Sequence, residues 1–204
     1  MKLFYAPAVC SMAAHIVAHE LGMSLDLEKV DLKTKRTTGG RDFTGINPKG
    51  YVPTLELDDG SLLTENIAIL QYLAAQQPHQ KLVPAHGSPA FFRLLEWLGF
   101  INSEVHKTFT PLWHAEYPAE MHALARETLG KRLTHLDRHL ADHRYLLGDT
   151  FSLVDAYAFT VVNWATYLKL DTSPYPNLQR YQADIAARPS VRQAMAAEGL
   201  LKAA

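Results

Sequence analysis

The pattern of hydrophobic and polar positions changes near residue 80. Before this point, short stretches that alternate apolar and polar residues stand beside helix-like stretches. After it, apolar residues recur every three or four positions, as they do on one face of a helix. The pattern therefore predicts a mixed N-terminal domain over residues 1–80, a linker over 81–89 and an all-helical domain over 90–204.

Strand-like and helix-like stretches follow one another in the first half of the N-terminal domain. The aromatic-rich run Lys2–Ala6 predicts a strand, which Pro7 ends. The run Ser11–Leu21 predicts a helix closed by Gly22. A second strand is predicted over Leu25–Leu32, where apolar and polar residues alternate.

The second half of this domain begins with a long polar segment, "KTKRTTGGRDFTGINPKG", which predicts a loop with one helical turn. The stretch "YVPTLELDDGSLLTE" predicts two short strands, because Asp59-Gly60 favours a tight hairpin turn. The stretch "ENIAILQYLAAQ" predicts a helix with Ile67, Leu70 and Leu73 on one face. This order of elements indicates a small mixed sheet with helices against it.

The second half of the chain shows helical spacing and almost no strand alternation. Three prolines and a glycine in "PHQKLVPAHGSPA" separate it from the first half. One helix start is well marked, because Ser152 stands three residues before Asp155 in "FSLVDAYAF". The aspartate can reach back to the serine amide, as in a capping box. We interpret this motif as structural.

Composition excludes several classes of protein. Hydrophobic residues make up 48% of the chain and charged residues 20%, as in an ordinary globular protein. The 20 basic and 21 acidic residues nearly balance, so we expect no nucleic-acid partner. No apolar run approaches the roughly 20 residues of a membrane-spanning helix, so we expect no membrane partner.

The single cysteine, Cys10, cannot form an intramolecular disulfide, which is typical of a reducing cytoplasm. The short apolar stretch before it is broken by Pro7 and does not resemble a secretion signal. Cys10 directly precedes a predicted helix, whose N-terminal dipole favours the thiolate and lowers a thiol pKa. Burial of the thiol as a small hydrophobic group is an equally good interpretation. Tyr5 and Ser11 carry hydroxyls that could face the same pocket.

Two further motifs could hold a ligand. In "GYVPTL", a cis bond before Pro53 would leave the backbone of Val52 free to pair with an extended peptide. An ordinary trans proline is the commoner case. In "LLTENIAIL", free amides at the helix start could bind a carboxylate and Glu65 an ammonium, although plain capping explains the same residues.

The polar segment holds a short run of positive charge in Lys33, Lys35 and Arg36. These residues could hold a second carboxylate of a ligand. A solvated surface is the ordinary interpretation of such a run.

Four stretches, "KLFYAPAVCS", "INPKGYVPTLELDDG", "LLTENIAILQYL" and "FSLVDAYAF", stand in an order and spacing that resemble a cytosolic glutathione transferase, most closely the bacterial beta class. The resemblance covers essentially the whole chain. It implies a thioredoxin-like N-terminal domain (β-α-β-α-β-β-α), an all-α C-terminal helical bundle and a cytoplasmic homodimer. It also implies glutathione as co-substrate, a small apolar electrophile and no metal.

The resemblance assigns roles to residues of the N-terminal domain. Cys10 corresponds to the cysteine that lies beside, or bonds to, the sulfur of glutathione, with Tyr5 and Ser11 as further catalytic candidates. The remaining matches are expected to bind the tripeptide: Lys35 at the glycine carboxylate, Val52 before a cis Pro53 at the cysteinyl unit, and Glu65 with Asn66 at the γ-glutamyl group. Asn66 stands where serine is common and can still donate and accept hydrogen bonds.

In the helical domain, "SEVHKTF" resembles the segment that closes over the site. The candidates there are Ser103, Glu104, His106 and Lys107. Among them His106 is the candidate for proton transfer or hydrogen bonding near sulfur, and Glu104 would reach the ligand of a neighbouring subunit. Gly99 stands where beta-class relatives often have asparagine, so one polar contact near the thiol is expected to be missing.

Two groups of residues have a more ordinary interpretation. Histidines recur every four residues at His135, His139 and His143, and again at His15 and His19. We predict no metal site, because the zincin pattern with its glutamate is missing. Most aromatic residues are expected in the core. The exceptions could wall an apolar pocket for a second substrate: Trp113, Tyr117 and Trp164.

The sequence thus predicts a glutathione S-transferase that conjugates the glutathione thiolate to apolar electrophiles, with a disulfide reductase or peroxidase activity through Cys10 as a second route. The alternative is a non-catalytic binding or regulatory protein on the same fold. A third interpretation is an isomerase or dehalogenase that uses glutathione as a cofactor.

Overall fold

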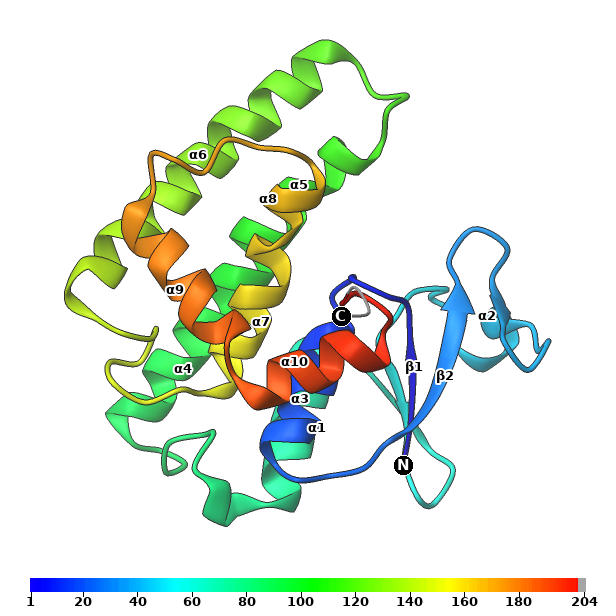
Figure 1. The fold of residues 1–204 in the computed structure, drawn as a ribbon. Coiled ribbons are helices and arrows are strands. Elements are labelled where there is room, and N and C mark those ends of the chain that lie inside the picture. Colours follow the sequence, from blue (N-terminus) through cyan, green and yellow to red (C-terminus); the bar gives the residue numbers. More distant parts are fainter. Residues whose placement is uncertain (202–204) are drawn as a thin grey trace. The chain divides into compact units, whose positions relative to one another are not determined.

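The computed structural model describes residues 1–201 and divides into two compact units (Figure 1). One unit comprises Met1–Gln80 together with the chain from Ala187 onward, and the other comprises Lys81–Ala186. The sequence placed the end of the chain in the helical domain of 90–204, of which residues 202–204 lie outside the described residues. Helix α10 (Pro189–Ala197) packs on α1 (Met12–Glu20) of the N-terminal unit, and its buried face carries Val191 and Ala194.

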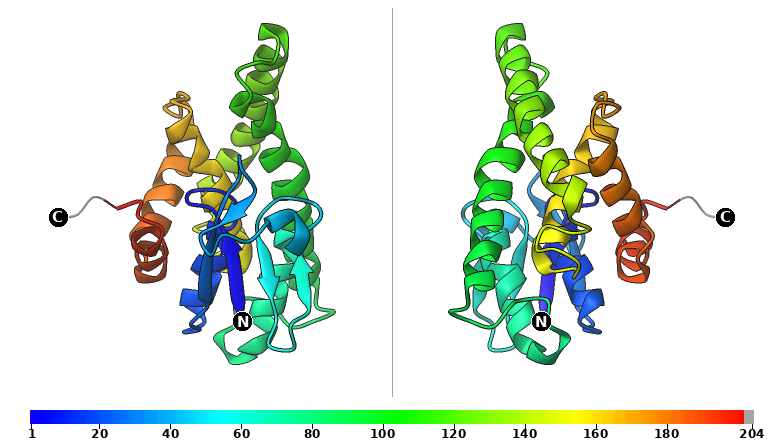
Figure 2. Two further views of the ribbon diagram at one scale, coloured as in Figure 1. Left: turned by 90° about the vertical axis from the view of Figure 1, so that its right-hand side faces the viewer. Right: turned by 90° about the vertical axis from the view of Figure 1, so that its left-hand side faces the viewer.

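A five-stranded sheet with the order β3-β2-β1-β4-β5 forms the centre of the N-terminal unit. Its strands are β1 (Lys2–Tyr5), β2 (Asp26–Asp31), β3 (Arg36–Thr37), β4 (Thr54–Glu56) and β5 (Leu62–Thr64). The β1–β2 pair is parallel and the other pairs are antiparallel. In Figure 2 the dark blue β1 lies between β2 and the cyan strands β4 and β5.

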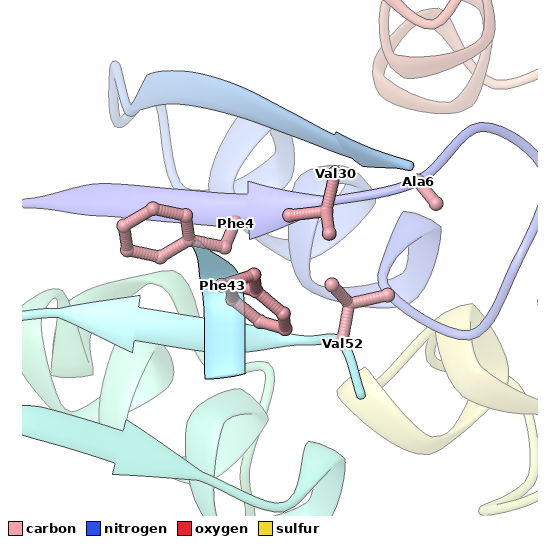
Figure 3. Packing of buried hydrophobic residues seen from close by; sticks show 5 residues of the cluster. All are labelled: Phe4, Ala6, Val30, Phe43 and Val52. Atoms are coloured by element: carbon pink, nitrogen blue, oxygen red, sulfur yellow. The ribbon is translucent and has the colours of Figure 1, made fainter. Parts of the chain in front are cut away.

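Both faces of this sheet are covered by helices. Helices α1 and α3 (Asn66–Gln76) lie on one side, and the short α2 (Phe43–Ile46) lies on the other (Figure 1). The sequence sets this arrangement, because neighbouring residues of a strand point to opposite faces. Figure 3 shows the cluster on the α2 side, where Phe4 contacts Phe43 with ring centroids 5.7 Å apart. The cluster consists of Phe4, Ala6, Val30, Phe43 and Val52.

The strands and helices expected before residue 80 are present, with one addition. The polar segment after Asp31 contains the expected helical turn as α2, and it also contains the two-residue strand β3. A strand of two residues is too short to show an alternation of apolar and polar positions, so the sequence pattern could not predict it. The unit's N-terminal stretch closes with a 3₁₀ turn, η1 (Pro78–Gln80).

The second unit is helical, as predicted. Its elements are α4 (Pro89–Phe100), the π-helix η2 (Ile101–His106), α5 (Lys107–Phe109), the 3₁₀ turn η3 (Thr110–Trp113), α6 (Ala119–Asp142), α7 (Leu153–Val162), α8 (Trp164–Tyr167) and α9 (Pro176–Ala186). Helix α9 packs against α6, and α7 packs on η2, α4 and α9.

Helix α7 is the central element of this unit, because all ten of its residues are buried. Its start follows the predicted capping box. The amide of Ser152 donates to the Asp155 carboxylate at 2.8 Å, and the same carboxylate accepts hydrogen bonds from the Leu146 amide and the Tyr181 hydroxyl. Burial raises the pKa of Asp155, although these hydrogen bonds oppose the shift. The carboxylate thus ties α7 to a preceding loop and to α9.

Among residues 1–201, no helix is both long enough and apolar enough to cross a membrane.

Candidate functional site

Cys10 lies in the loop between β1 and α1, and Ser11 fixes the shape of that loop. The Ser11 hydroxyl accepts a hydrogen bond from the Ala6 amide at 3.2 Å and donates one to the Ala6 carbonyl at 3.1 Å. Its side chain is fully buried. Ser11 was predicted as a catalytic candidate, and in this structure both of its hydrogen bonds hold the backbone of the Cys10 loop.

The thiol of Cys10 contacts Val52, which lies just before β4. Its Sγ–H donates to the main-chain carbonyl of Val52 across 3.3 Å. The Val52–Pro53 bond is cis. The cis bond that the resemblance implied is therefore confirmed, and the commoner trans form is wrong here. The Val52 carbonyl was expected to be unpaired and is not. Among residues 1–201 the Val52 amide has no hydrogen-bond partner, so one backbone donor is left for a ligand.

Asn66, the first residue of α3, links this helix to the same loop. Its Nδ2 donates to the carbonyl of Cys10 at 3.2 Å. Its Oδ1 is buried and has no partner among the described residues. A buried acceptor without a partner is unusual and marks a place where a donor from a ligand or water is expected.

Glu65 holds an unusual backbone conformation directly before α3. Its φ angle is +70°, in the left-handed region that only a few per cent of non-glycine residues adopt. Its Oε1 accepts hydrogen bonds from Lys49 Nζ at 2.6 Å and from the Tyr51 hydroxyl at 2.7 Å. Hydrogen bonding to Glu65 raises the pKa of Lys49. Backbone strain of this kind clusters at ligand sites.

Lys49 and Tyr51 were not among the predicted site residues. Both are exposed and stand within the "PKGYVP" stretch that carries the cis proline. A charged and an aromatic residue beside a predicted ligand-binding edge were the only signals available. The sequence could not show that both side chains turn toward Glu65, which lies fourteen to sixteen positions farther along the chain.

Lys35 also has a left-handed backbone, with a φ of +56°. Its Nζ donates to the Gly50 carbonyl at 2.8 Å, so the ammonium lies at the end of the loop that leads into the cis proline. The other two basic residues of this run behave differently. Lys33 is exposed, and the Arg36 guanidinium donates to Gly40 within its own turn. Lys35 is therefore the member of the run that reaches the Val52 segment.

Tyr5 is buried, and burial followed by the nearby Glu198 carboxylate raises its pKa. The phenol keeps its proton at neutral pH and so stays available as a hydrogen-bond donor. The Glu198 carboxylate supports the Cys10 loop. It accepts a hydrogen bond from the Ala8 amide at 3.0 Å and lies 3.4 Å from His15 Nδ1.

In the helical unit, His106 ends the π-helix η2. Its Nδ1 lies 2.7 Å from the Tyr157 hydroxyl of α7, and its ring meets Trp164 edge-on with centroids 4.8 Å apart. Burial, with a smaller effect of the Lys107 charge, lowers the pKa of His106 to about 4. The imidazole is therefore neutral at physiological pH. Isolated π-helical turns are frequent at functional sites.

The other candidates of this segment lie on the same π-helix and just after it. Ser103 Oγ donates to the Gly99 carbonyl at 2.9 Å, and Glu104 forms an ion pair of 2.6 Å with Arg132. Lys107 is exposed at the start of α5. None of these side chains contacts His106 through a hydrogen bond among the described residues.

The predicted aromatic wall is partly assembled. Trp113 and Trp164 meet edge-to-face with ring centroids 6.1 Å apart, whereas Tyr117 stacks on His114 at 4.7 Å. Trp113 is 47% exposed, which is high for so large an apolar side chain. The exposed Trp113 therefore packs against the buried Trp164, and Tyr117 contacts His114 instead.

The histidine pairs pack as aromatic rings. His15 stacks on His19 with centroids 4.9 Å apart, and His139 stacks on His143 at 4.3 Å. Within residues 1–201, no three histidine, cysteine or acidic side chains are grouped so that they could hold a metal ion.

Comparison with known proteins identifies two domains that together cover most of the chain. Residues 9–76 match the family model of the glutathione S-transferase N-terminal domain, and residues 100–189 match that of the C-terminal domain. The protein named glutathione S-transferase GstA from Escherichia coli O157:H7 is 42% identical over 98% of this chain and 100% of its own length.

Solved structures agree with these matches. A sphingomonad glutathione S-transferase complexed with glutathione is 44% identical, with a TM-score of 0.94 over 98% of this chain and 100% of that one. The bacterial beta-class enzyme of Sphingomonas chungbukensis is 43% identical, with a TM-score of 0.95 and the same coverage.

Proposed function

Because the chain belongs to the glutathione S-transferase family, we propose that its N-terminal unit binds glutathione and that the enzyme joins the glutathione sulfur to a small apolar electrophile. The observation that carries the proposal is one set of contacts around Cys10. The thiol meets the Val52 carbonyl, and the Cys10 carbonyl meets Asn66. These two hydrogen bonds bring together the thiol, the cis-proline edge and the start of α3.

In this unit, each part of the tripeptide has a proposed partner of opposite charge or complementary hydrogen bonding. The unpaired Val52 amide serves the cysteinyl unit, because a backbone donor at a strand edge can pair with an extended peptide. Glu65 and Asn66 serve the γ-glutamyl group, whose ammonium and carboxylate need an acceptor and a donor. The Lys35 ammonium serves the glycine carboxylate. The unpaired Oδ1 of Asn66 supports this arrangement.

Conjugation requires that the glutathione thiol lose its proton and that the resulting thiolate attack the electrophile. With a chlorinated aromatic compound, a carbon–sulfur bond forms, the carbon–chlorine bond breaks and chloride leaves. Positioned hydrogen-bond donors stabilise the thiolate, and binding both reactants lowers the entropic barrier. We assign the thiol of Cys10 to the surroundings of this sulfur, and the resemblance gives His106 a role in proton transfer or hydrogen bonding.

A redox reaction is the second route. The Cys10 thiolate attacks the glutathione sulfur of a mixed disulfide, which forms a Cys10–glutathione disulfide and releases the other thiolate. A second glutathione thiolate then attacks that disulfide, which frees Cys10 and yields oxidised glutathione. The two steps balance with glutathione as the reductant and need no metal.

The helical unit supplies the surface for the electrophile. The exposed Trp113, which packs against the buried Trp164, offers an apolar aromatic surface of the kind that lines small-molecule sites. Ser103, Glu104 and Lys107 stand on the segment that the resemblance places over the site. We propose that Glu104 reaches the glutathione of a partner subunit in a homodimer, and that the enzyme works in the cytoplasm, where its one cysteine stays reduced.

Immobilised glutathione and a chlorinated nitroaromatic substrate test the proposal together. We expect the protein to be retained on the resin, to be eluted by free glutathione and to release one chloride for each conjugate formed. Retention without turnover would favour the non-catalytic binding protein. Failure to bind glutathione at all would contradict the proposal. The named relatives are described as transferases, which favours the enzyme over that alternative.

A further inference from the structure

We propose that Tyr157 and Asn102 are positioning residues that hold His106 in its Nδ1–H form and thereby keep Nε2 as a hydrogen-bond acceptor for the thiol of a bound substrate. This inference rests on the proposed function for the identity of the thiol. It concerns two residues that the comparison with the family did not single out. Both belong to the same helical unit as His106.

The direction of the hydrogen bonds follows from the two acceptors that the chain offers. The Tyr157 hydroxyl donates its single proton to Asn102 Oδ1 at 2.9 Å. The Tyr157 oxygen must then act as the acceptor toward His106 Nδ1, which lies 2.7 Å away. An acceptor on that side requires that Nδ1 carry the imidazole hydrogen. In a neutral ring this leaves the lone pair on Nε2.

The local fold explains why these three side chains meet. Asn102 and His106 are four residues apart in the π-helix η2, and Tyr157 comes from the fully buried helix α7, which packs on η2. The Tyr157 side chain has no exposed surface, so its hydroxyl cannot turn to solvent. Trp164 lies edge-on to the His106 ring and limits its rotation. The tautomer is therefore set by packing.

The free nitrogen of His106 is chemically useful because the ring stays neutral. Its Nε2 has no hydrogen-bond partner among the described residues, and the side chain is only partly buried. The low pKa of the ring means that Nε2 presents a lone pair at neutral pH instead of a proton. A thiol that reaches this nitrogen would donate a hydrogen bond to it, whereas an Nε2–H group could not accept one.

Nuclear magnetic resonance of the imidazole nitrogens tests the tautomer without any turnover. In a long-range proton–nitrogen spectrum of the ¹⁵N-labelled enzyme at pH 7, we expect His106 Nδ1 to be protonated and Nε2 to be unprotonated. The signals are assigned by their loss in His106→Gln. A wild-type spectrum with the hydrogen on Nε2 would overturn the inference.

Substitutions that remove either positioning residue should shift the tautomer in the same direction. In Tyr157→Phe the acceptor for Nδ1–H is lost, and in Asn102→Leu the hydroxyl is released to donate to Nδ1, so both should move the hydrogen toward Nε2. Asn102→Asp keeps an acceptor for the hydroxyl and should retain the Nδ1–H form. The control Tyr175→Phe removes another hydroxyl of the same unit, which bonds the Gly130 carbonyl, and should leave His106 unchanged.

Kinetics then separate this inference from the proposed function. For Tyr157→Phe and Asn102→Leu we expect kcat to fall about threefold to tenfold, the factor that one ordinary hydrogen bond supplies, with little change in KM for glutathione. Asn102→Asp should recover most of the loss. Unchanged kcat in correctly folded Tyr157→Phe, or an unchanged tautomer, would overturn the inference. Lack of turnover in the wild type would instead overturn the proposed function, and the tautomer spectrum would still decide the roles of Tyr157 and Asn102.

Discussion

The side-chain amide of Asn66 donates a hydrogen bond of 3.2 Å to the main-chain carbonyl of Cys10. The first residue of α3 therefore fixes the position of the residue that carries the thiol, although 56 positions separate them in the chain. Cys10 is held at two points, because Asn66 bonds its main-chain carbonyl and its sulfur contacts the Val52 carbonyl. The geometry of the N-terminal site depends on contacts among three segments that are distant in sequence.

Replacement of Asn66 by alanine should weaken glutathione binding, because it frees the Cys10 loop and removes an amide proposed to contact the γ-glutamyl group. We expect KM for glutathione to rise about threefold to tenfold, as for the loss of one hydrogen bond. Steady-state kinetics at varied glutathione concentration measure this. Gln71→Ala on the same helix, which loses only a bond to its own helix, is the control. An unchanged KM in Asn66→Ala would contradict the assignment.

Replacement of Cys10 by alanine separates the two chemical routes. We expect disulfide reductase activity to disappear, because the attacking sulfur is gone. Conjugation should remain in part, because its nucleophile belongs to glutathione. The measurements are turnover of a mixed disulfide and of a chlorinated nitroaromatic by the same preparation, with circular dichroism to confirm folding. An equal loss of both activities would show that one thiol serves both reactions.

The pKa of His106 predicts a particular behaviour in acid. Burial lowers this pKa from 6.5 to about 4, so the folded protein resists protonation of the ring. The His106 contribution to stability is present above the unfolded pKa and is lost as pH falls through the range from 6.5 to about 4. In a pH titration followed by nuclear magnetic resonance, the His106 ring signals should stay constant from pH 8 to about 5.5. A midpoint near 6.5 would show that the ring is not desolvated.

The attachment of α10 to α1 should also depend on pH. Arg188 donates to both oxygens of Glu20 at 2.7 and 2.9 Å, and Ser190 donates to the same carboxylate. Burial opposes the charged form, but these hydrogen bonds lower the pKa of Glu20 overall. The stabilisation is therefore present above the unfolded pKa of about 4.3 and is lost as pH falls through the lower folded value.

Glu20→Gln tests this attachment. At pH 7 we expect the variant to unfold with about 1–3 kcal/mol less free energy than the wild type, the usual contribution of a charge-assisted hydrogen bond. The difference should shrink as the pH is lowered, because the wild-type carboxylate is then protonated. Urea unfolding at a series of pH values measures it. Glu127→Gln, which breaks an exposed pair with Lys131, is the control. A difference that does not change with pH would argue against the ion pair as its cause.

The sequence predicted the elements of the fold well where a periodic pattern or a capping motif marks them. Helix α7 and its capping box are examples, because Ser152 and Asp155 are three positions apart and interact locally. The placement of α10 could not be predicted, since its helical spacing is the same whichever unit it packs on. What decides it is the contact of Arg188 with Glu20, across 168 positions.

The site shows the same division between local and distant contacts. The motif around Cys10 was found from its position before a helix, but the sequence could not show that the nearby Tyr5 and Ser11 are both buried. Tyr157 was missed because it stands in a uniformly apolar helix, where a hydroxyl is ordinarily a core group. Only the fold shows that this hydroxyl meets His106.

Calorimetric titration with glutathione tests the central claim most directly. We predict that the wild type binds one glutathione for each chain and that Glu65→Gln, which removes the charge facing the ligand ammonium, weakens the affinity about tenfold or more. Glu116→Gln, an exposed glutamate paired with His114 in the helical unit, should bind as the wild type does. Equal affinity of Glu65→Gln and the wild type, or no binding of glutathione by the wild type, would contradict the account.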